Sequence, residues 1–464
     1  MSAHSHFREE NMQQEKALIR IIHNIFGQIS MPALAALTIA LALVMLSIAF
    51  LLLFKSRKAL SDGMRLGDMR VFLPVLLIVL SFPTMSGCQD MTKGYQGMTN
   101  NATASTSAGN TVAAADDTAL TTAGDTAQSP EPKRPLIIKH GWEFPTVTFV
   151  AENIREMEKR PVDGVAIRMD DSMSERVMRT IPISYEMFAK NLRPLADLNS
   201  PTLKHNFIIV FATPAGNIFD KGWDVVAQNF GNLARAAKEV GLEGIFFDIE
   251  EYFGESLQYP ANCGNDKTVE EARSKMRERG RQIMDAMRAE WSDVRFLSTH
   301  GPYLSDSATF KYLGENGMIL NDVAWANVLN TSLLVGMMQS AYGTDAKFID
   351  GGEIYEARTL EHFEAVKHWQ KDGMAENSEV IPDEFRSKWS GALSSSFGIY
   401  DACSDMDIDT WKSTIINALK TADDYIWLYS EKYDWWKEEN CWPDTPLPQE
   451  WDDATREAWQ AVSK

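Results

Sequence analysis

Asp248 and Glu250 are the carboxylates in this sequence whose position best suits chemistry. They end a short apolar run, Gly244-Ile245-Phe246-Phe247, and Tyr252 follows them. Such a run is typical of a buried parallel strand, and residues two apart on extended backbone point the same way. The carboxyl ends of strands in α/β folds bind ligands. Paired carboxylates there suit glycosidic bond cleavage, which needs an acid and a nucleophile or base. A salt-bridged acidic loop is the alternative.

Glu353 is the third candidate catalytic acid, because the motif Asp350-Gly351-Gly352-Glu353 follows another predicted strand. We expect Glu250 or Asp248 to pair with Glu353 across a shared mouth. One acid would protonate the leaving oxygen while the other attacks the anomeric carbon or activates water. A separation of about 5–5.5 Å would give retention of configuration, and about 6.5–9.5 Å would give inversion. The acid needs a raised pKa, which burial beside aromatic rings supplies. The candidate rings are Tyr252, Tyr355 and Trp435.

Alternating strands and helices must position these acids. Eight apolar runs are predicted strands: Leu136–Lys139, Gly164–Met169, Phe207–Ala212, Gly244–Asp248, Arg295–Thr299, Lys347–Asp350, Ser395–Tyr400 and Tyr425–Tyr429. Amphipathic segments separate them. One closes at Gly241, and another begins with a capping box at Thr268 and Glu271. Eight such units within residues 135–464 predict a (β/α)₈ TIM barrel. A doubly wound open sheet is the runner-up, but no glycine-rich phosphate loop follows any strand.

The loops after the predicted strands supply candidate substrate-binding groups. His140, Arg168 and His300 could hold sugar hydroxyls, and Trp142, Tyr303 and Trp435 could stack on pyranose faces. The remaining predicted binding residues are Tyr252, Asp350, Tyr355, Asp401, Tyr429 and Glu431. Structural alternatives exist for several of them. His300 can be an internal hydrogen-bond partner, Arg168 can neutralise Asp248 or Glu250, and one of Trp435 and Trp436 can belong to the core.

Over roughly residues 135–436 the chain resembles the (β/α)₈ glycoside hydrolases. Asp248 and Glu250 match the last two acids of the chitinase-type strand ending D-x-x-D-x-D-x-E, whereas Glu243 and Phe246 stand at its first two positions. Acids on the fourth and sixth strands are similar to the α-galactosidase arrangement. The resemblance implies a hydrolase acting on a poly- or oligosaccharide. We expect no cofactor and no metal site, since no H-E-x-x-H or similar motif is present.

The amino-terminal third indicates membrane targeting. Residues 1–63 form an extension in which Met31 to Phe54 carry no charge, long enough for a transmembrane helix. Residues 64–88 read as a signal peptide whose end, Met85-Ser86-Gly87-Cys88, resembles a bacterial lipobox. Cys88 would then be lipidated, and translation could begin at Met1, Met64 or Met69. Both interpretations place the catalytic domain in the cell envelope, periplasmic or extracellular, on a lipid anchor or transmembrane helix.

Composition and net charge bear on the linker, the partners and the disulfides of this protein. Residues 89–134 are rich in Thr, Ala, Ser and Gly and predict a disordered linker. The net charge of −19 argues against nucleic acid as a partner. An oxidising compartment would allow a bridge among Cys263, Cys403 and Cys441, with Cys403–Cys441 as one pairing.

Three other functions compete with the hydrolase. One is a non-catalytic carbohydrate-binding surface lipoprotein, which would bind glycans without turnover. The second is a hydrolase or lyase of another polar polymer whose acids hold a divalent metal. The third is an envelope scaffold that neither binds nor cleaves.

Overall fold

The computed structural model describes residues 134–213, 215–250, 257–318, 328–403, 405–436, 443 and 445–462. The predicted transmembrane helix, the signal peptide with Cys88, Tyr252, Cys441 and the linker up to residue 133 lie outside these ranges. Within the described ranges no helix is long and apolar enough to cross a membrane. Cys263 and Cys403 form no disulfide with each other within the described ranges. Because Cys441 lies outside these ranges, the Cys403–Cys441 bridge stays a prediction.

Nine parallel strands form one curled sheet in the order β7-β6-β5-β4-β3-β2-β1-β9-β8. They are β1 (Leu136–Gly141), β2 (Gly164–Ile167), β3 (Phe207–Phe211), β4 (Gly244–Asp248), β5 (Arg295–Ser298), β6 (Lys347–Asp350), β7 (Ser394–Ser395), β8 (Gly398–Tyr400) and β9 (Tyr425–Ser430). The edge strands β7 and β8 are two pieces of the predicted seventh strand. They pair with β6 and β9 respectively. Only Ser396 and Phe397 separate these two edges along the chain, so the curled sheet with its helices fits an α/β barrel.

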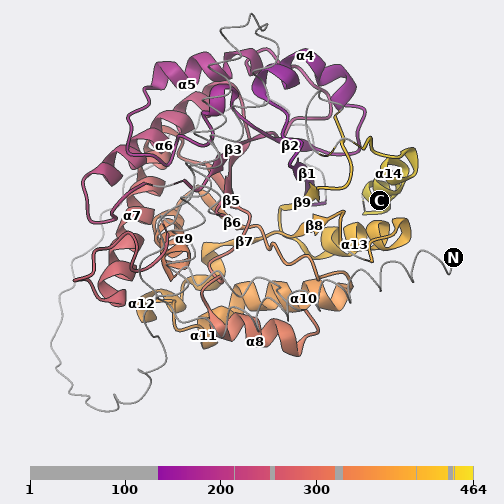
Figure 1. Ribbon diagram of the computed structural model, residues 1–464. Helices are drawn as coiled ribbons and strands as arrows, with labels where there is room; N and C mark the ends of the chain where they lie inside the picture. The colour runs from indigo at the N-terminus through magenta and orange to yellow at the C-terminus, as the bar shows by residue number, and fades with distance from the viewer. Residues whose placement is uncertain are drawn as a thin grey trace, which may run out of the picture. The chain divides into compact units, whose positions relative to one another are not determined.

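Helices surround the strands, as Figure 1 shows. The longer ones are α4 (Val147–Met157), α5 (Tyr185–Leu192), α6 (Gly222–Glu239), α7 (Val269–Glu290), α8 (Ser307–Glu315), α9 (Val328–Ala341), α10 (Leu360–His368), α13 (Ile408–Thr421) and α14 (Gln449–Val462). Short turns α11 (Met374–Asn377) and α12 (Asp383–Arg386) precede β7. The capping box at Thr268 is confirmed at the start of α7. The carboxyl-terminal helix α14 packs on α13, outside the barrel.

Side-chain alternation along the strands divides the core into two layers. Rings and aliphatic groups such as Ile138, Phe246 and Trp427 fill the barrel interior. Their sequence neighbours, such as Ile137 and Phe247, belong to the larger cluster shared with the helices. A residue at a strand end therefore points into the interior if it lies an even number of positions from an interior residue, and toward the helices if that number is odd.

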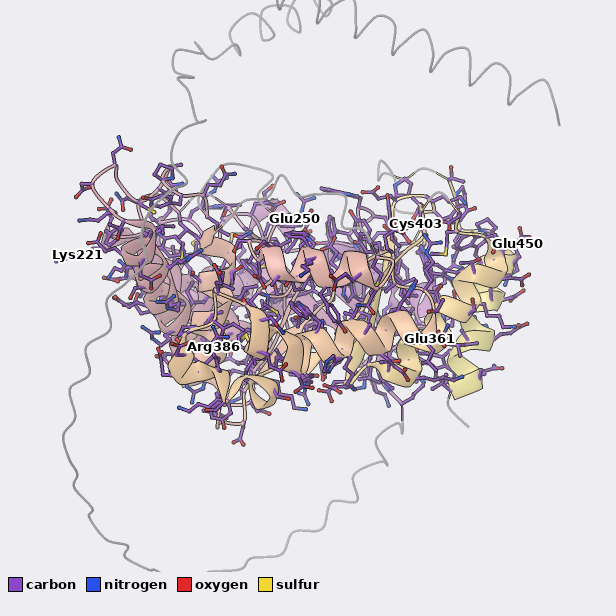
Figure 2. All side chains as sticks on the ribbon, turned by 90° about the horizontal axis from the view of Figure 1, so that it is seen from below. Lys221, Glu250, Glu361, Arg386, Cys403 and Glu450 are labelled. Carbon is purple, nitrogen blue, oxygen red and sulfur yellow. The ribbon has the colours of Figure 1, made fainter. Side chains whose placement is uncertain are left out.

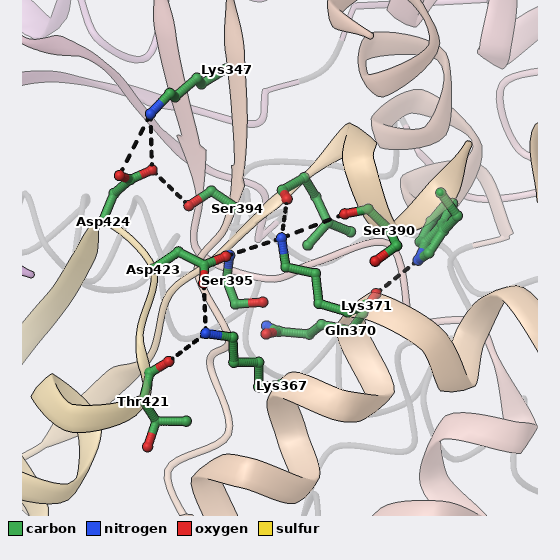
Figure 3. A network of polar contacts seen from close by, with 12 residues as sticks. Lys347, Lys367, Gln370, Lys371, Ser390, Ser394, Ser395, Thr421, Asp423 and Asp424 are labelled. Carbon is green, nitrogen blue, oxygen red and sulfur yellow. Dashed lines mark hydrogen bonds and ion pairs between the residues drawn. The ribbon is translucent and has the colours of Figure 1, made fainter. Parts of the chain in front are cut away.

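A network of ion pairs and hydrogen bonds links several elements of the barrel near strand β7 (Figure 3). Asp424 accepts a hydrogen bond from Ser394 (2.9 Å) and pairs with Lys347 (3.3 Å). Asp423 binds Lys367 (2.6 Å) and accepts from the Ser395 backbone N–H (2.9 Å). These contacts join the start of β9 to β6, β7 and α10. The network lies at the amino ends of β6 and β9, away from the predicted acids.

Candidate active site

Asp248, the last residue of β4, is buried beside Glu250. It is 4% exposed, and its Oδ1 accepts the backbone N–H of Glu250 at 3.1 Å. Burial, together with the negative charges of Glu250 and Glu353, raises the pKa of Asp248 well above its ordinary value. Asp248 therefore favours its protonated form and fixes the backbone of the acid that follows it.

Glu250, His300 and Glu353 converge from the carboxyl ends of β4, β5 and β6. His300 Nε2 lies 3.4 Å from Glu250 Oε1 and 3.1 Å from Glu353 Oε2. These three ligand atoms lie within 4.8 Å of one another. In Figure 2 Glu250 and Cys403 lie toward the same edge of the molecule, opposite Arg386. The structure thus brings together the acids expected on the fourth and sixth strands, with an imidazole between them.

Burial and charge act in opposite directions on this trio. Burial lowers the pKa of His300, but the carboxylates of Glu353 and Glu250 outweigh it and raise that pKa to about 9. Burial raises the pKa of Glu353 to about 7, against the opposing effects of the His300 charge and of the Tyr355 hydroxyl. At neutral pH the site therefore holds an imidazolium between two carboxyl groups, one of them poised to exchange a proton.

Four aromatic residues, Trp142, Tyr355, Tyr400 and Tyr429, form one side of the mouth, here called the aromatic wall. The Tyr355 hydroxyl donates to Glu353 Oε1 at 2.8 Å, and the Tyr355 and Tyr429 rings are stacked with centroids 5.8 Å apart. The hydroxyls of Tyr429 (3.0 Å) and Tyr400 donate to Glu431. The Trp142 indole N–H donates to the same carboxylate at 2.7 Å. Glu431 thus accepts hydrogen bonds from three members of the aromatic wall, and the fourth, Tyr355, links the wall to Glu353.

Tyr400 is the member of the wall that was not among the predicted binding residues. The sequence indicates a binding role for Tyr400 only weakly, because a tyrosine at the end of a strand is equally typical of core packing. Its register with Tyr429 on the paired strand β9 places both rings on the same face. That pairing becomes visible only when the two strands are adjacent.

The structure corrects the placement of Tyr303 and Asp350, which were expected to face the substrate. Both are completely buried. Ile349 fills the barrel interior, so Asp350 points outward toward the helices, as does its register partner Ser298. Burial raises the pKa of Asp350 to about 7, and its Oδ1 accepts the Gly352 N–H at 3.0 Å. These two residues support the loops that carry His300 and Glu353.

Trp435, Arg168 and Asp401 are likewise committed to other contacts. Trp435 is 1% exposed and packs over Lys139, so it is not a stacking platform. It also lines a separate cavity of about 520 Å³ between α4 and α14 that none of the three converging groups lines. Arg168 pairs with Glu175 rather than with Asp248 or Glu250. Asp401 accepts the backbone N–H groups of Glu431 (2.9 Å) and Lys432 (3.1 Å).

His140 also lies inside the barrel rather than in the mouth. It is 4% exposed, and its ring centroid is 4.6 Å from that of Phe246 and 5.3 Å from that of Tyr429. Burial lowers its pKa well below the ordinary value, so the imidazole is neutral. His140 thus packs against the Tyr429 ring of the aromatic wall, and its predicted contact with a sugar hydroxyl stays a prediction.

Comparisons with known proteins identify no family. No family model and no curated protein match the chain. Solved structures with similar folds include Aspergillus clavatus Sph3 in complex with GalNAc, which is 12% identical, with 71% of this chain and 98% of that chain covered and a TM-score of 0.32. The Pseudomonas stutzeri endoglucanase Cel5A is 10% identical, with 70% and 94% covered and a TM-score of 0.36.

A Bacteroides ovatus GH5 xyloglucanase in complex with a XXXG heptasaccharide is also similar. It is 10% identical, with 71% of this chain and 75% of that chain covered and a TM-score of 0.36. Other neighbours are a 3-keto-D-glucoside 4-epimerase, a 2,3-dimethylmalate lyase and an endonuclease IV. The named activities of these neighbours thus differ, and glycoside hydrolases are among them.

Proposed function

We propose that this protein is a glycoside hydrolase that cleaves a poly- or oligosaccharide with Glu250 and Glu353. The observation that carries the proposal is the approach of these two carboxylates to a single imidazole, 3.4 Å and 3.1 Å from His300 Nε2, beside a wall of aromatic rings. Two acids at this spacing suit a bond whose oxygen must be protonated while its carbon is attacked. The aromatic wall would offer apolar faces to a sugar ring.

The environments of the two acids suggest their roles. Glu353 is the more enclosed, with a pKa of about 7, and is the proposed general acid and base. Glu250, whose side chain is 20% exposed, is the proposed nucleophile. Its oxygen lies within 4.8 Å of that of Glu353, close to the separation of about 5–5.5 Å typical of retaining enzymes. Retention of configuration is therefore the expected outcome.

The test is hydrolysis by Glu250→Gln and Glu353→Gln against a polysaccharide panel, scored by released reducing ends. Each change should lower kcat by about 10²–10⁴-fold while the thermal unfolding temperature stays close to that of the wild type. The matched control is Glu243→Gln, since Glu243 lies just before the same strand β4 at its amino end, where it pairs with His205 and Arg295. Near-wild-type hydrolysis by both active-site variants would contradict the proposal. Glycan binding without turnover by the wild type would favour the carbohydrate-binding alternative.

A metal-dependent hydrolase or lyase is the second candidate. In the part of the chain that the structure describes, Glu250, His300 and Glu353 form the group that could hold a cation. Carboxylate and imidazole ligands suit Mn²⁺, Fe²⁺ or Zn²⁺. Activity that is lost on chelation and restored by one of these ions would favour this candidate. Activity unchanged by chelators favours the two-carboxylate mechanism.

We also propose that the barrel is held at the cell envelope, outside the cytoplasm, through Cys88 or through the segment 31–54. The support is the apolar segment and the lipobox-like residues of the sequence. Labelling with a lipid precursor, compared between the wild type and Cys88→Ala, separates the two anchors. Label that depends on Cys88 supports the lipoprotein, and its absence leaves the transmembrane helix.

A further inference from the structure

Lys139 and Glu143 form a buried ion pair behind the aromatic wall. Each side chain is 1% exposed, and the two groups are in direct contact. Lys139 points outward from β1, because Ile138 and His140 face the interior. Its ammonium group also donates to the His140 carbonyl and lies 5.2 Å from the centre of the Trp435 ring.

This pair has little value as a source of stability. Moving two charges out of water costs several kcal/mol each, and apolar replacement of buried pairs is often neutral or stabilising. Burial lowers the pKa of Lys139 and raises that of Glu143 to about 7, so the cost of desolvation is visible in both groups. What the pair does supply is geometry. Four residues of extended chain span about 13 Å, so contact between residues 139 and 143 requires the chain to turn back after β1.

The turn carries Trp142. Its backbone N–H donates to the Ser430 carbonyl at 3.2 Å, and its indole donates to Glu431. Gly141 has no room for a side chain, since a Cβ there would lie 2.3 Å from a Glu143 carboxylate oxygen and 2.7 Å from the Ser430 carbonyl. The closed turn therefore depends on both the glycine and the ion pair.

We infer that Lys139 and Glu143 are positioning residues that hold Trp142, and through Glu431 the rest of the aromatic wall, in the geometry that binds substrate. A continuous series of contacts supports this: the ion pair closes the turn, Trp142 binds Glu431, Glu431 accepts the Tyr400 and Tyr429 hydroxyls, and both rings pack on Tyr355. Tyr355 in turn binds Glu353. The kinetic part of this inference rests on the proposed hydrolase function, whereas the structural part does not.

The test replaces both charges with apolar groups, Lys139→Met with Glu143→Leu, which avoids leaving one charge unpaired. Hydrogen exchange is measured by mass spectrometry on peptides covering residues 140–145, and kinetics on a hydrolysed oligosaccharide. We expect faster exchange in that segment alone, a KM about tenfold higher and a kcat within threefold of the wild type; tenfold corresponds to about 1.4 kcal/mol. In a Trp142→Ala background the double change should raise KM no further, because both act through the same ring.

The control is the ion pair Arg134–Asp163 at the other end of β1, whose side chains are 2% and 14% exposed. Arg134→Met with Asp163→Leu should leave KM and exchange at residues 140–145 unchanged. Unchanged exchange or unchanged KM in the Lys139/Glu143 variant overturns the inference. If that variant does not fold, Glu143→Gln is judged by the same two criteria. If the wild type hydrolyses no sugar, the exchange result alone decides, and it does so independently of the proposed function.

Discussion

Replacing the imidazole between the two acids, His300→Gln, should move the alkaline limb of the pH–rate profile upward. The His300 charge opposes the burial that raises the pKa of Glu353 to about 7. Two unit charges about 4 Å apart interact by on the order of 4 kcal/mol at an effective dielectric constant of 20, or about three pKa units at most. Removing one opposite charge at this range typically shifts a carboxyl pKa by about one to three units. The pKa of Glu353 should therefore rise to about 8–10.

The assay is kcat/KM as a function of pH on an oligosaccharide that the wild type hydrolyses, because this ratio reports the free enzyme. If Glu353 is the general acid, activity is lost as its proton leaves, with a wild-type midpoint near pH 7. The variant's midpoint should lie at least one unit higher, even if its maximal rate is lower. The matched control is His205→Gln, since His205 pairs with Glu243 at 3.0 Å near the amino ends of the strands. Its midpoint should not move.

A midpoint that stays near 7 or falls in His300→Gln would refute the assignment. It would mean that the limb belongs to a group that does not sense His300, or that the imidazole is not charged when the enzyme is active. Either result would remove Glu353 from the acid role while leaving the convergence of the three groups intact.

Three further predictions concern the supports of the site. Asp350→Asn should flatten the pH dependence of the free energy of unfolding. The folded-state pKa of Asp350 is about 7 against an ordinary 3.8. The stabilising effect of the protonated carboxyl group is therefore complete below about pH 4 and is lost as the pH rises to about 7. Between pH 5 and 7 the wild type should lose about 2 kcal/mol of unfolding free energy in urea titrations relative to the variant, and parallel curves would contradict this. Tyr355→Phe should lower kcat/KM about tenfold, since one hydrogen bond to Glu353 is lost (2.8 Å); an unchanged value would exclude that contact from catalysis. Gly301→Ala should destabilise the fold by about 1–3 kcal/mol, because a Cβ would lie 2.0 Å from Asp350 Oδ2; an unchanged urea midpoint would show that this loop is not packed as described.

The strands were readable from sequence because buried parallel strands leave a local mark. The run before Asp248 is almost entirely apolar, and β4 ends at that residue as predicted. Splitting of the seventh strand was not readable. Ser396 and Phe397 interrupt pairing because β7 binds β6 while β8 binds β9, a long-range choice that no local pattern records.

The sequence alone determined which acids could meet, because parallel strands in a barrel all deliver their carboxyl ends to one face. Glu250 and Glu353 followed from that rule. Tertiary structure decided which of their neighbours face the mouth, because side-chain direction depends on register with adjacent strands. Tyr303, Asp350 and Trp435 have suitable chemistry, but Tyr303 and Trp435 belong to the cluster shared with the helices, and Asp350 alternates with the interior residue Ile349. The contact of His300 with both acids likewise arises from three strands separated in the chain, and only their pairing in the sheet could bring it about.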